Sequence, residues 1–351
     1  MPLRRIKNEA NEIEEEIKKK RTKFDSSFDA NEGNFKDGVL STGSTLLNLS
    51  ISGGRIEGGG IPGGVLVEVF GPSQVGKTAI LAEVAASAQS KGGEAKFADP
   101  EARLDKEYSK IYGFKINEEN YSRPNTVKEV FKPLRVWSPI ENKINVYAAD
   151  SLAALSTEME MEEEEGDKRG QKRAKDFSEQ LRKHCRILAN NNWVMICSNQ
   201  IRQGDRGYVT PGGEAIKFYS SIRIKMSPAF PGSKIIKKIK NSAGVEIEKA
   251  IGIKSNCEVI KSVDDPYREC SISIIFGYGI DDIRDQLEYY KAMTKENTFN
   301  SIEKSFRSLD QAVEYIEQNK LVKKLKERTI GIWQEMEELF SFNRKRIKKE
   351  R

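Results

Sequence analysis

The 351-residue sequence has little of what several common chemistries require. Its one histidine is His184, so a Ser/His or Cys/His nucleophilic site is not expected. Its four cysteines form no C-x-x-C pair, which argues against a zinc site and favours a reducing, cytoplasmic compartment. There is no run of 18 apolar residues, and the opening MPLRRIKNEA lacks the apolar core of a signal peptide. We therefore expect no membrane partner.

The charge balance is slightly basic, with 59 Lys and Arg against 53 Asp and Glu, a net charge of +6. Nucleic-acid binding needs positive charge gathered on one surface, so this composition permits a DNA partner without establishing one. The chain length and its 37% of hydrophobic residues are sufficient for one large domain and a smaller one.

Apolar spacing divides the chain into three parts. Residues 1–35 hold a predicted helix with one narrow apolar stripe, followed by a polar linker. A single stripe must pack on its own domain or on another protomer, and we favour protomer–protomer packing. Residues 284–351 suggest a small helical domain that ends in the basic tail NRKRIKKER. Its apolar residues indicate one helix or two within 302–316 and another within 321–339.

The middle part, residues 36–283, alternates strand and helix patterns. Short apolar segments at VLVEVF, AKFAD, INVYAAD and WVMICSNQ predict buried strands, and SIRIKM predicts a half-exposed one. An Ala-rich helix is expected between Thr78 and Ser90. This order predicts an α/β fold with a doubly wound, mainly parallel sheet and helices on both faces.

A phosphate-binding pattern follows the first of these strands. It fits G-x-x-x-x-G-K-S/T and comprises Gly71, Pro72, Ser73, Gln74, Val75, Gly76, Lys77 and Thr78. Backbone N–H groups of such a loop and the following helix N-terminus hold phosphate oxygens. Lys77 is expected to reach the β- and γ-phosphates, and Thr78 to ligate Mg²⁺. A chance glycine-rich turn is the alternative, which the flanking strand and helix disfavour.

Two carboxylates follow neighbouring strands and should emerge at the same sheet edge. Asp150 ends INVYAAD and is the expected second metal-side ligand, although an Asp at this place also caps the next segment. Glu101 follows AKFAD and is a candidate for positioning the attacking water, with Asp99 as its competitor.

Several segments together resemble RecA-type recombinases. They are STGSTLLNLSISGG, VEVFGPSQVGKT, FADPEARLDKEY, ADSLAAL, SNQIR and GGEAIKFYSSIRIKM, in matching order over roughly residues 38–283. The resemblance implies a RecA-type P-loop ATPase core that uses ATP and Mg²⁺. It implies that Glu101 activates water, that Asp150 is the Walker B aspartate and that Gln200 senses the γ-phosphate. Asp105 and Tyr108 then lie on the adenine side, with Tyr108 stacking on the base.

The resemblance also implies two DNA-binding loops. The first spans about 162–172, and the helix after it carries Lys175, Ser178 and Arg182 on one face, as their spacings of 3 and 4 require. The second is RQGDRGYVTPGG, for which a surface loop without a DNA role is the alternative. Its expected DNA-binding residues are Arg202 and Arg206 for phosphates, Tyr208 for bases, and Gly212 and Gly213 through backbone N–H groups.

This sequence departs from the family pattern in three places. An acidic run, residues 158–167, precedes the first DNA-binding helix and would repel phosphate unless it faces away. Two lysines of a neighbouring protomer reach ATP in the family, but here only Lys261 aligns, across a gap, with Lys254 as another candidate. The second lysine falls on Ser262 or has no counterpart. The basic tail replaces an acidic one, which suggests a divergent, UvsX-like recombinase of a phage or mobile element, acting in bacterial or phage-infected cytoplasm.

The expected function is therefore an ATP-dependent DNA recombinase. It would form a helical homo-oligomer on single-stranded DNA, pair it with a homologous duplex and exchange strands, with DNA-dependent ATP hydrolysis. Single-strand-binding and mediator proteins are further expected partners. The alternatives are another RecA-core ATPase, such as a ring helicase or a RadA-type repair ATPase, and a non-hydrolysing filament or mediator protein. The lack of a zinc-finger cysteine set argues against a RadA-type ATPase, and the intact set of Lys77, Thr78, Glu101, Asp150 and Gln200 argues against a non-hydrolysing protein. A ring helicase stays open at this point.

Overall fold

The computed structural model describes residues 37–156, 169–204, 207–209 and 213–340. The predictions for the N-terminal helix, the acidic run 158–167 and the basic tail lie outside these residues. No described helix is both long enough and apolar enough to cross a lipid bilayer.

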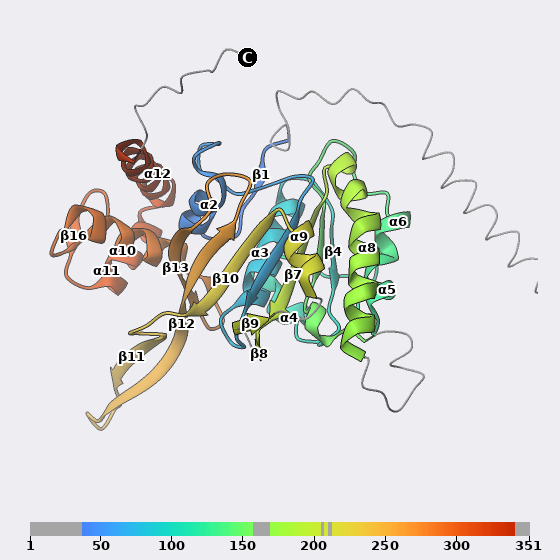
Figure 1. Cartoon of the computed structure of the whole chain (residues 1–351). Coiled ribbons are helices and arrows are strands. Elements are labelled where there is room, and N and C mark those ends of the chain that lie inside the picture. The colour runs from blue at the N-terminus through green and yellow to red at the C-terminus, as the bar shows by residue number, and fades with distance from the viewer. Residues whose placement is uncertain (1–36, 157–168, 205–206, 210–212, 341–351) are drawn as a thin grey trace, which may run out of the picture.

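One large sheet forms the centre of the molecule, with the strand order β14-β13-β12-β10-β3-β7-β6-β4-β5 (Figure 1). Its parallel half contains β3 (Leu66–Gly71), β4 (Ala95–Ala98), β5 (Tyr121–Ser122), β6 (Val146–Ala149), β7 (Val194–Gln200) and β10 (Ile222–Pro228). The predicted α/β fold with a mainly parallel sheet is confirmed. The sequence did not predict the antiparallel extension through β12 (Glu246–Lys261), β13 (Arg268–Ile275) and β14 (Gly279–Ile280).

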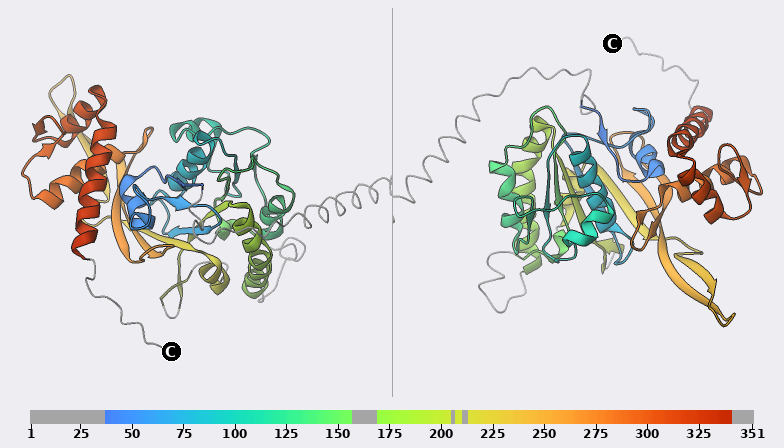
Figure 2. Two further views of the ribbon diagram at one scale, coloured as in Figure 1. Left: turned by 90° about the horizontal axis from the view of Figure 1, so that it is seen from above. Right: turned by 180° about the vertical axis from the view of Figure 1, so that it is seen from behind.

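The two faces of the parallel half bury different side chains, because successive residues of a strand point to opposite faces. In β3, Val67 and Val69 join a core with α3 (Lys77–Ser90), whereas Leu66 joins a core on the other face. That second face is covered by α5 (Val127–Phe131), α6 (Pro133–Val136), α8 (Arg169–Asn191) and α9 (Gly213–Tyr219). Figure 2 shows these two helical layers from further directions. β3, β6 and β7 are therefore buried on both sides, whereas β10 alternates buried with partly exposed residues, as its sequence predicted.

A long hairpin leaves the body of the molecule at the antiparallel edge (Figure 1). It consists of β11 (Lys234–Lys240) and the first part of β12, which pair in antiparallel register. Lys237 lies opposite Lys249, and Ile239 lies opposite Ile247.

The C-terminal elements have a hydrophobic core of their own. They are α10 (Asp282–Thr294), β15 (Phe299–Asn300), β16 (Ser305–Phe306), α11 (Leu309–Gln318) and α12 (Val322–Leu339). The expected helix within 302–316 begins only at Leu309, because Ser308 caps it by accepting a hydrogen bond from the Gln311 N–H. The preceding residues form a small two-stranded sheet, which the helical pattern did not indicate. In α12, Trp333 packs against Leu49 of α2 (Thr45–Ser52) and ties this unit to the core.

Candidate functional site

The glycine-rich loop lies between the carboxyl end of β3 and the first turn of α3. Gly76 precedes α3 with φ 88°, and a Cβ there would lie 2.1 Å from Ile274 Cδ1, so the fold requires glycine. A Cβ on Gly71 would lie 2.2 Å from the carbonyl oxygen of Met226 in β10. Close approach of the β10 backbone thus requires glycine at position 71, and the left-handed backbone conformation favours glycine at position 76. The loop is held in place as a backbone cradle at a helix N-terminus.

Lys77 curls back into this loop. Its Nζ donates to the carbonyl oxygens of Gly71 at 3.0 Å and Pro72 at 2.6 Å. Burial lowers the pKa of Lys77, while the nearby carboxylates of Asp150 and Glu101 oppose that shift. The ammonium group therefore contacts carbonyl oxygens of its own loop, and its expected contact with the β- and γ-phosphates stays a prediction.

Thr78 and Asp150 form the second part of the site. Thr78 Oγ1 donates to Asp150 Oδ2 at 2.5 Å, and the hydroxyl of Ser198 in β7 donates to the other oxygen, Oδ1. Burial raises the pKa of Asp150, and the hydrogen bonds from Ser198 and Thr78 oppose this shift. A hydroxyl and a carboxylate oxygen are hard ligands of the kind that Mg²⁺ prefers, so this pair fits the expected metal.

Glu101 and Gln200 meet at the same sheet edge. Gln200 Nε2, at the end of β7, lies 3.5 Å from Glu101 Oε1, which also accepts a hydrogen bond from Ser151 Oγ. Arg103 Nε lies 2.6 Å from Glu101 Oε2. The sequence identified Glu101 and Gln200 but missed Ser151 and Arg103, although both are within two residues of a predicted site residue.

Asp99, the competitor of Glu101, has a different place. It is fully buried, and its Oδ2 accepts hydrogen bonds from the Leu104 N–H and the Tyr121 hydroxyl, both at 2.8 Å. These contacts fix the turn that follows β4. Asp99 thus holds the loop, while Glu101 contacts Gln200.

Comparison with known proteins identifies relatives of this chain. Residues 10–281 match the family model described as the RecA N-terminal domain. The chain is 34% identical to Protein RecA of Thermus thermophilus over 253 residues, 70% of this chain and 69% of that protein. It is 32% identical to Protein RecA of Phytoplasma mali over 287 residues, 79% of each chain. The chain belongs to the RecA family.

On the expected adenine side of this RecA-family core, Asp105 has a structural contact. It caps α4 (Lys106–Ile111), since its Oδ1 accepts the Tyr108 N–H at 2.7 Å. The Tyr108 ring is 40% exposed and stands edge-on to Tyr112, whose hydroxyl donates to the Tyr108 hydroxyl at 2.9 Å. Tyr108 therefore offers a supported, accessible ring.

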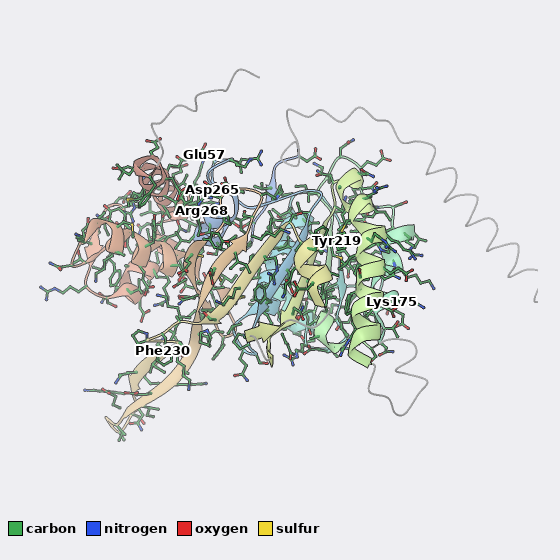
Figure 3. The ribbon with its side chains drawn as sticks, in the orientation of Figure 1. Glu57, Lys175, Tyr219, Phe230, Asp265 and Arg268 are labelled. Atoms are coloured by element: carbon green, nitrogen blue, oxygen red, sulfur yellow. The ribbon has the colours of Figure 1, made fainter. Side chains whose placement is uncertain are left out.

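The expected DNA-binding residues of this RecA-family chain lie on α8 and just after β7. Lys175 and Arg182 are exposed and Ser178 is half-buried, and Figure 3 marks Lys175 on α8. The second loop begins as a short hairpin, β8 (Arg202–Gly204) and β9 (Gly207–Val209), in which Gln203 lies opposite Tyr208. Gly213 begins α9. Arg206 and Gly212 lie outside the described residues.

The lysines expected to act on a neighbouring RecA-family protomer have partners within this chain. Lys261 Nζ donates to the carbonyl oxygens of Lys217 at 3.2 Å and Phe218 at 3.1 Å, and Lys254 forms an ion pair with Glu288. Ser262 Oγ donates to the Ile51 carbonyl oxygen. A role in trans for Lys254 or Lys261 stays a prediction.

One cluster beside the site escaped the sequence analysis. Glu68 of β3 is fully buried, and it accepts from Arg223 Nε of β10 at 2.7 Å and from Asn199 Nδ2 of β7 at 3.0 Å. The Arg223 guanidinium lies 4.6 Å from the centre of the Phe70 ring. Glu68, a charged residue within the otherwise apolar segment VLVEVF, was the only sign of this cluster in the sequence.

Proposed function

We propose that this protein is an ATP-dependent DNA recombinase, which forms a helical filament on single-stranded DNA and exchanges strands with a homologous duplex. One observation carries the proposal. The phosphate loop, the Thr78–Asp150 pair and the Glu101–Gln200 contact lie together at one edge of the sheet. Gln200 is two residues before Arg202, where the second expected DNA-binding loop begins.

In this proposal, the hydrolytic step uses mainly charge stabilisation and positioning. Lys77 neutralises negative charge that develops between the β- and γ-phosphates of ATP. Thr78 and Asp150 would hold Mg²⁺, which would supply further charge neutralisation at the phosphates. Glu101 accepts the proton of the attacking water, while Ser151 and Arg103 fix the orientation of its carboxylate.

Gln200 is the proposed link between nucleotide and DNA. Its side chain reaches Glu101, and its backbone leads into β8 at Arg202. A change in the position of Gln200 on hydrolysis would therefore be passed directly to the loop. DNA would be held through its phosphates by residues of α8 and of the loop, which are Lys175, Ser178, Arg182, Arg202, Arg206, Tyr208, Gly212 and Gly213.

A strand-exchange assay with homologous and non-homologous duplexes tests the proposal. We expect exchange that requires ATP, Mg²⁺ and homology, together with ATPase activity that single-stranded DNA stimulates. Electron microscopy with ATP and single-stranded DNA should show open helical filaments. Closed rings with duplex unwinding would instead identify a helicase. Filaments without any ATP hydrolysis would identify a non-hydrolysing mediator.

A further inference from the structure

Arg103 is a cation beside the nucleotide site that belongs to neither the glycine-rich motif nor the expected catalytic residues. It lies in the turn that connects β4 with α4, two elements labelled in Figure 1. Its Nε lies 2.6 Å from Glu101 Oε2, and Gln200 Nε2 lies 3.5 Å from the other oxygen of the same carboxylate. Arg103 therefore lies against the proposed water-activating residue, at the sheet edge that carries the phosphate loop.

The ion pair with Glu101 uses only part of the Arg103 guanidinium. Nε faces Glu101, whereas the terminal nitrogens Nη1 and Nη2 have no acceptor within the part of the chain that the structure describes. The Arg103 side chain is 57% exposed, while that of Glu101 is only 13% exposed. A guanidinium is a planar fork of N–H donors that matches phosphate oxygens. A pair through Nε therefore orients this fork and leaves its outer donors available for a phosphate group.

Asp99 fixes the backbone on both sides of Arg103. The Ala102 N–H donates to the Asp99 carbonyl oxygen at 3.1 Å, and the Leu104 N–H donates to Asp99 Oδ2 at 2.8 Å. Ala102 has a left-handed φ of 54°, which marks a tight turn, and the Leu104 side chain is buried in the core. A backbone held in this way keeps the guanidinium near the site before the substrate arrives, so little reorganisation is needed when charge develops there.

The charge of Arg103 also acts on the lysine of the phosphate loop. Burial is the largest cause that lowers the pKa of Lys77, and the nearby positive charge of Arg103 adds to this lowering. The carboxylates of Asp150 and Glu101 oppose it. Two cations that affect one another in this way repel, and a negatively charged group bound beside both of them reduces that repulsion. Lys77 and Arg103 together therefore favour a phosphate group at this place.

The cations expected from a neighbouring protomer are engaged elsewhere in this chain. Lys261 donates to carbonyl oxygens of α9, Lys254 is paired with Glu288, and Ser262 carries no charge. In P-loop enzymes, an arginine of the same chain can stabilise the transition state as well as one that a partner supplies. The position of Arg103 fits that role.

We propose that Arg103 is a catalytic residue that acts within its own protomer, with its terminal N–H groups on the γ-phosphate of ATP, where they stabilise the charge of the transition state. In this step the water oxygen forms a bond to the γ-phosphorus, the bond from that phosphorus to the β,γ-bridging oxygen breaks, and ADP leaves with the electron pair. Glu101 takes the proton of the water, while Arg103 Nε keeps the carboxylate oriented. The inference rests on the ATP hydrolysis proposed above, but not on filament formation or strand exchange.

The first test measures binding rather than turnover. The full-length protein is titrated with a fluorescent ADP analogue and Mg²⁺, with and without aluminium fluoride, which mimics the phosphoryl group in transfer. Arg103→Ala should bind the ADP analogue alone within about twofold of the wild type, but lose about 10²-fold or more of the affinity gained with aluminium fluoride. An equal gain in the two proteins, including no gain in either, would overturn the proposal.

The same titration in a Glu101→Gln background separates a direct contact from an effect through Glu101. If Arg103 contacts the phosphoryl group, Arg103→Ala should still lower the affinity gained with aluminium fluoride. If Arg103→Ala has no effect in that background, Arg103 only orients Glu101, and the catalytic assignment is wrong.

Steady-state ATPase kinetics give the second readout. Arg103→Ala should lower kcat by about 10²-fold or more and change KM for ATP much less, because the contact strengthens only in the transition state. Added guanidinium ion should restore part of the rate of Arg103→Ala. Lys110→Ala is the matched control, since it removes an exposed cation of the same segment that is paired with Glu107 at 2.6 Å, and it should behave as the wild type does. A raised KM with unchanged kcat would contradict the catalytic role.

Mixing two inactive variants tests whether Arg103 acts within its own protomer. Lys77→Ala protomers keep Arg103, so they could complement Arg103→Ala protomers only if this arginine reached a neighbouring site. We expect no recovery of ATPase activity, and recovery would overturn the assignment to the same protomer. Strand exchange is measured separately. Its absence in a wild type whose binding of the aluminium fluoride complex depends on Arg103 would refute the recombinase proposal and support this one.

Discussion

The buried cluster of Glu68, Arg223 and Asn199 allows a sharp test of what holds β3 and β10 together behind the phosphate loop. Replacing Arg223 by alanine removes the guanidinium that lies 2.7 Å from Glu68 Oε2. Glu68 is fully buried, and the Asn199 amide then remains as a donor to its carboxylate. The replacement leaves an acidic group in the protein interior without its ion-pair partner.

The expected loss of stability is about 3–5 kcal/mol, the usual cost of breaking a buried pair by removing one partner. The loss of the cation–π contact with Phe70 adds to it, by roughly 0.5–1 kcal/mol or more. The measurement is the free energy of unfolding from urea titration, followed by circular dichroism. Replacing both partners, as in Glu68→Leu with Arg223→Met, should recover most of the loss because no charge is then left buried.

Lys225 provides a matched control on the same strand. It forms an ion pair with Glu258 at 3.0 Å, but the two side chains are 48% and 32% exposed. Because solvent screens such a pair, Lys225→Ala should cost at most about 1 kcal/mol. If Arg223→Ala costs no more than Lys225→Ala, the buried pair is not what stabilises this part of the sheet.

Three other predictions concern chemistry, DNA and pH. Glu101→Gln should keep ATP binding and slow hydrolysis by about 10²-fold or more in a steady-state ATPase assay, and unchanged turnover would remove Glu101 from the proposed role. Lys175→Ala should lower, by about 0.7, the magnitude of the slope of log affinity for single-stranded DNA plotted against log salt concentration. Lys183→Ala is the control and should change this slope less, because Lys183 already forms an ion pair with Glu179. Burial, and the nearby carboxylate of Asp282, raise the pKa of Glu83 to about 7. Between about pH 4.5 and 7 the folded protein therefore keeps a proton on Glu83 that the unfolded chain has lost, so the free energy of unfolding should fall as pH rises through this range. Glu83→Gln should flatten that part of the curve of melting temperature against pH, and an unchanged slope would contradict this reasoning.

Local patterns in the sequence were sufficient for β3, β4, β6, β7 and β10 of the parallel half and for the phosphate loop, but not for the two-residue strand β5. Strands buried on both faces have continuous apolar runs, and the loop motif has a fixed length between strand and helix. Glu101 and Gln200 could be placed at one edge because the carboxyl ends of parallel strands meet there. Their contact with each other follows from that placement.

The features that the sequence did not predict depend on contacts between segments that are distant in the chain. Nothing in a single-chain pattern pairs Glu68 with Arg223, which are 155 residues apart in the sequence. The antiparallel strands β12 and β13 contain many polar residues, so apolar and polar residues alternate only weakly along them. The apolar pattern also placed the start of α11 too early, because Ser308 caps this helix and the residues before Ser308 form a short sheet.

The end of β7 explains how one strand can serve two faces of the sheet. Ser198 and Gln200 contact Asp150 and Glu101 on the nucleotide side, whereas Asn199, which points to the opposite face, contacts Glu68. That opposite face carries α8 and α9, marked in Figure 3 by Lys175 and Tyr219.

Asn199→Ala should therefore leave ATP affinity without DNA nearly unchanged and reduce the mutual effect of ATP and DNA on each other's affinity. Coupling of this kind is typically about 1–3 kcal/mol and must be equal in both directions. Fluorescence titrations of each ligand, with and without the other, measure both directions. Asn199→Asp is a poor substitute because it would place a second carboxylate beside Glu68, so Asn199→Ser, which keeps a donor, is the control. If ATP enhances DNA affinity equally in wild type and in Asn199→Ala, the two faces communicate through Gln200 alone.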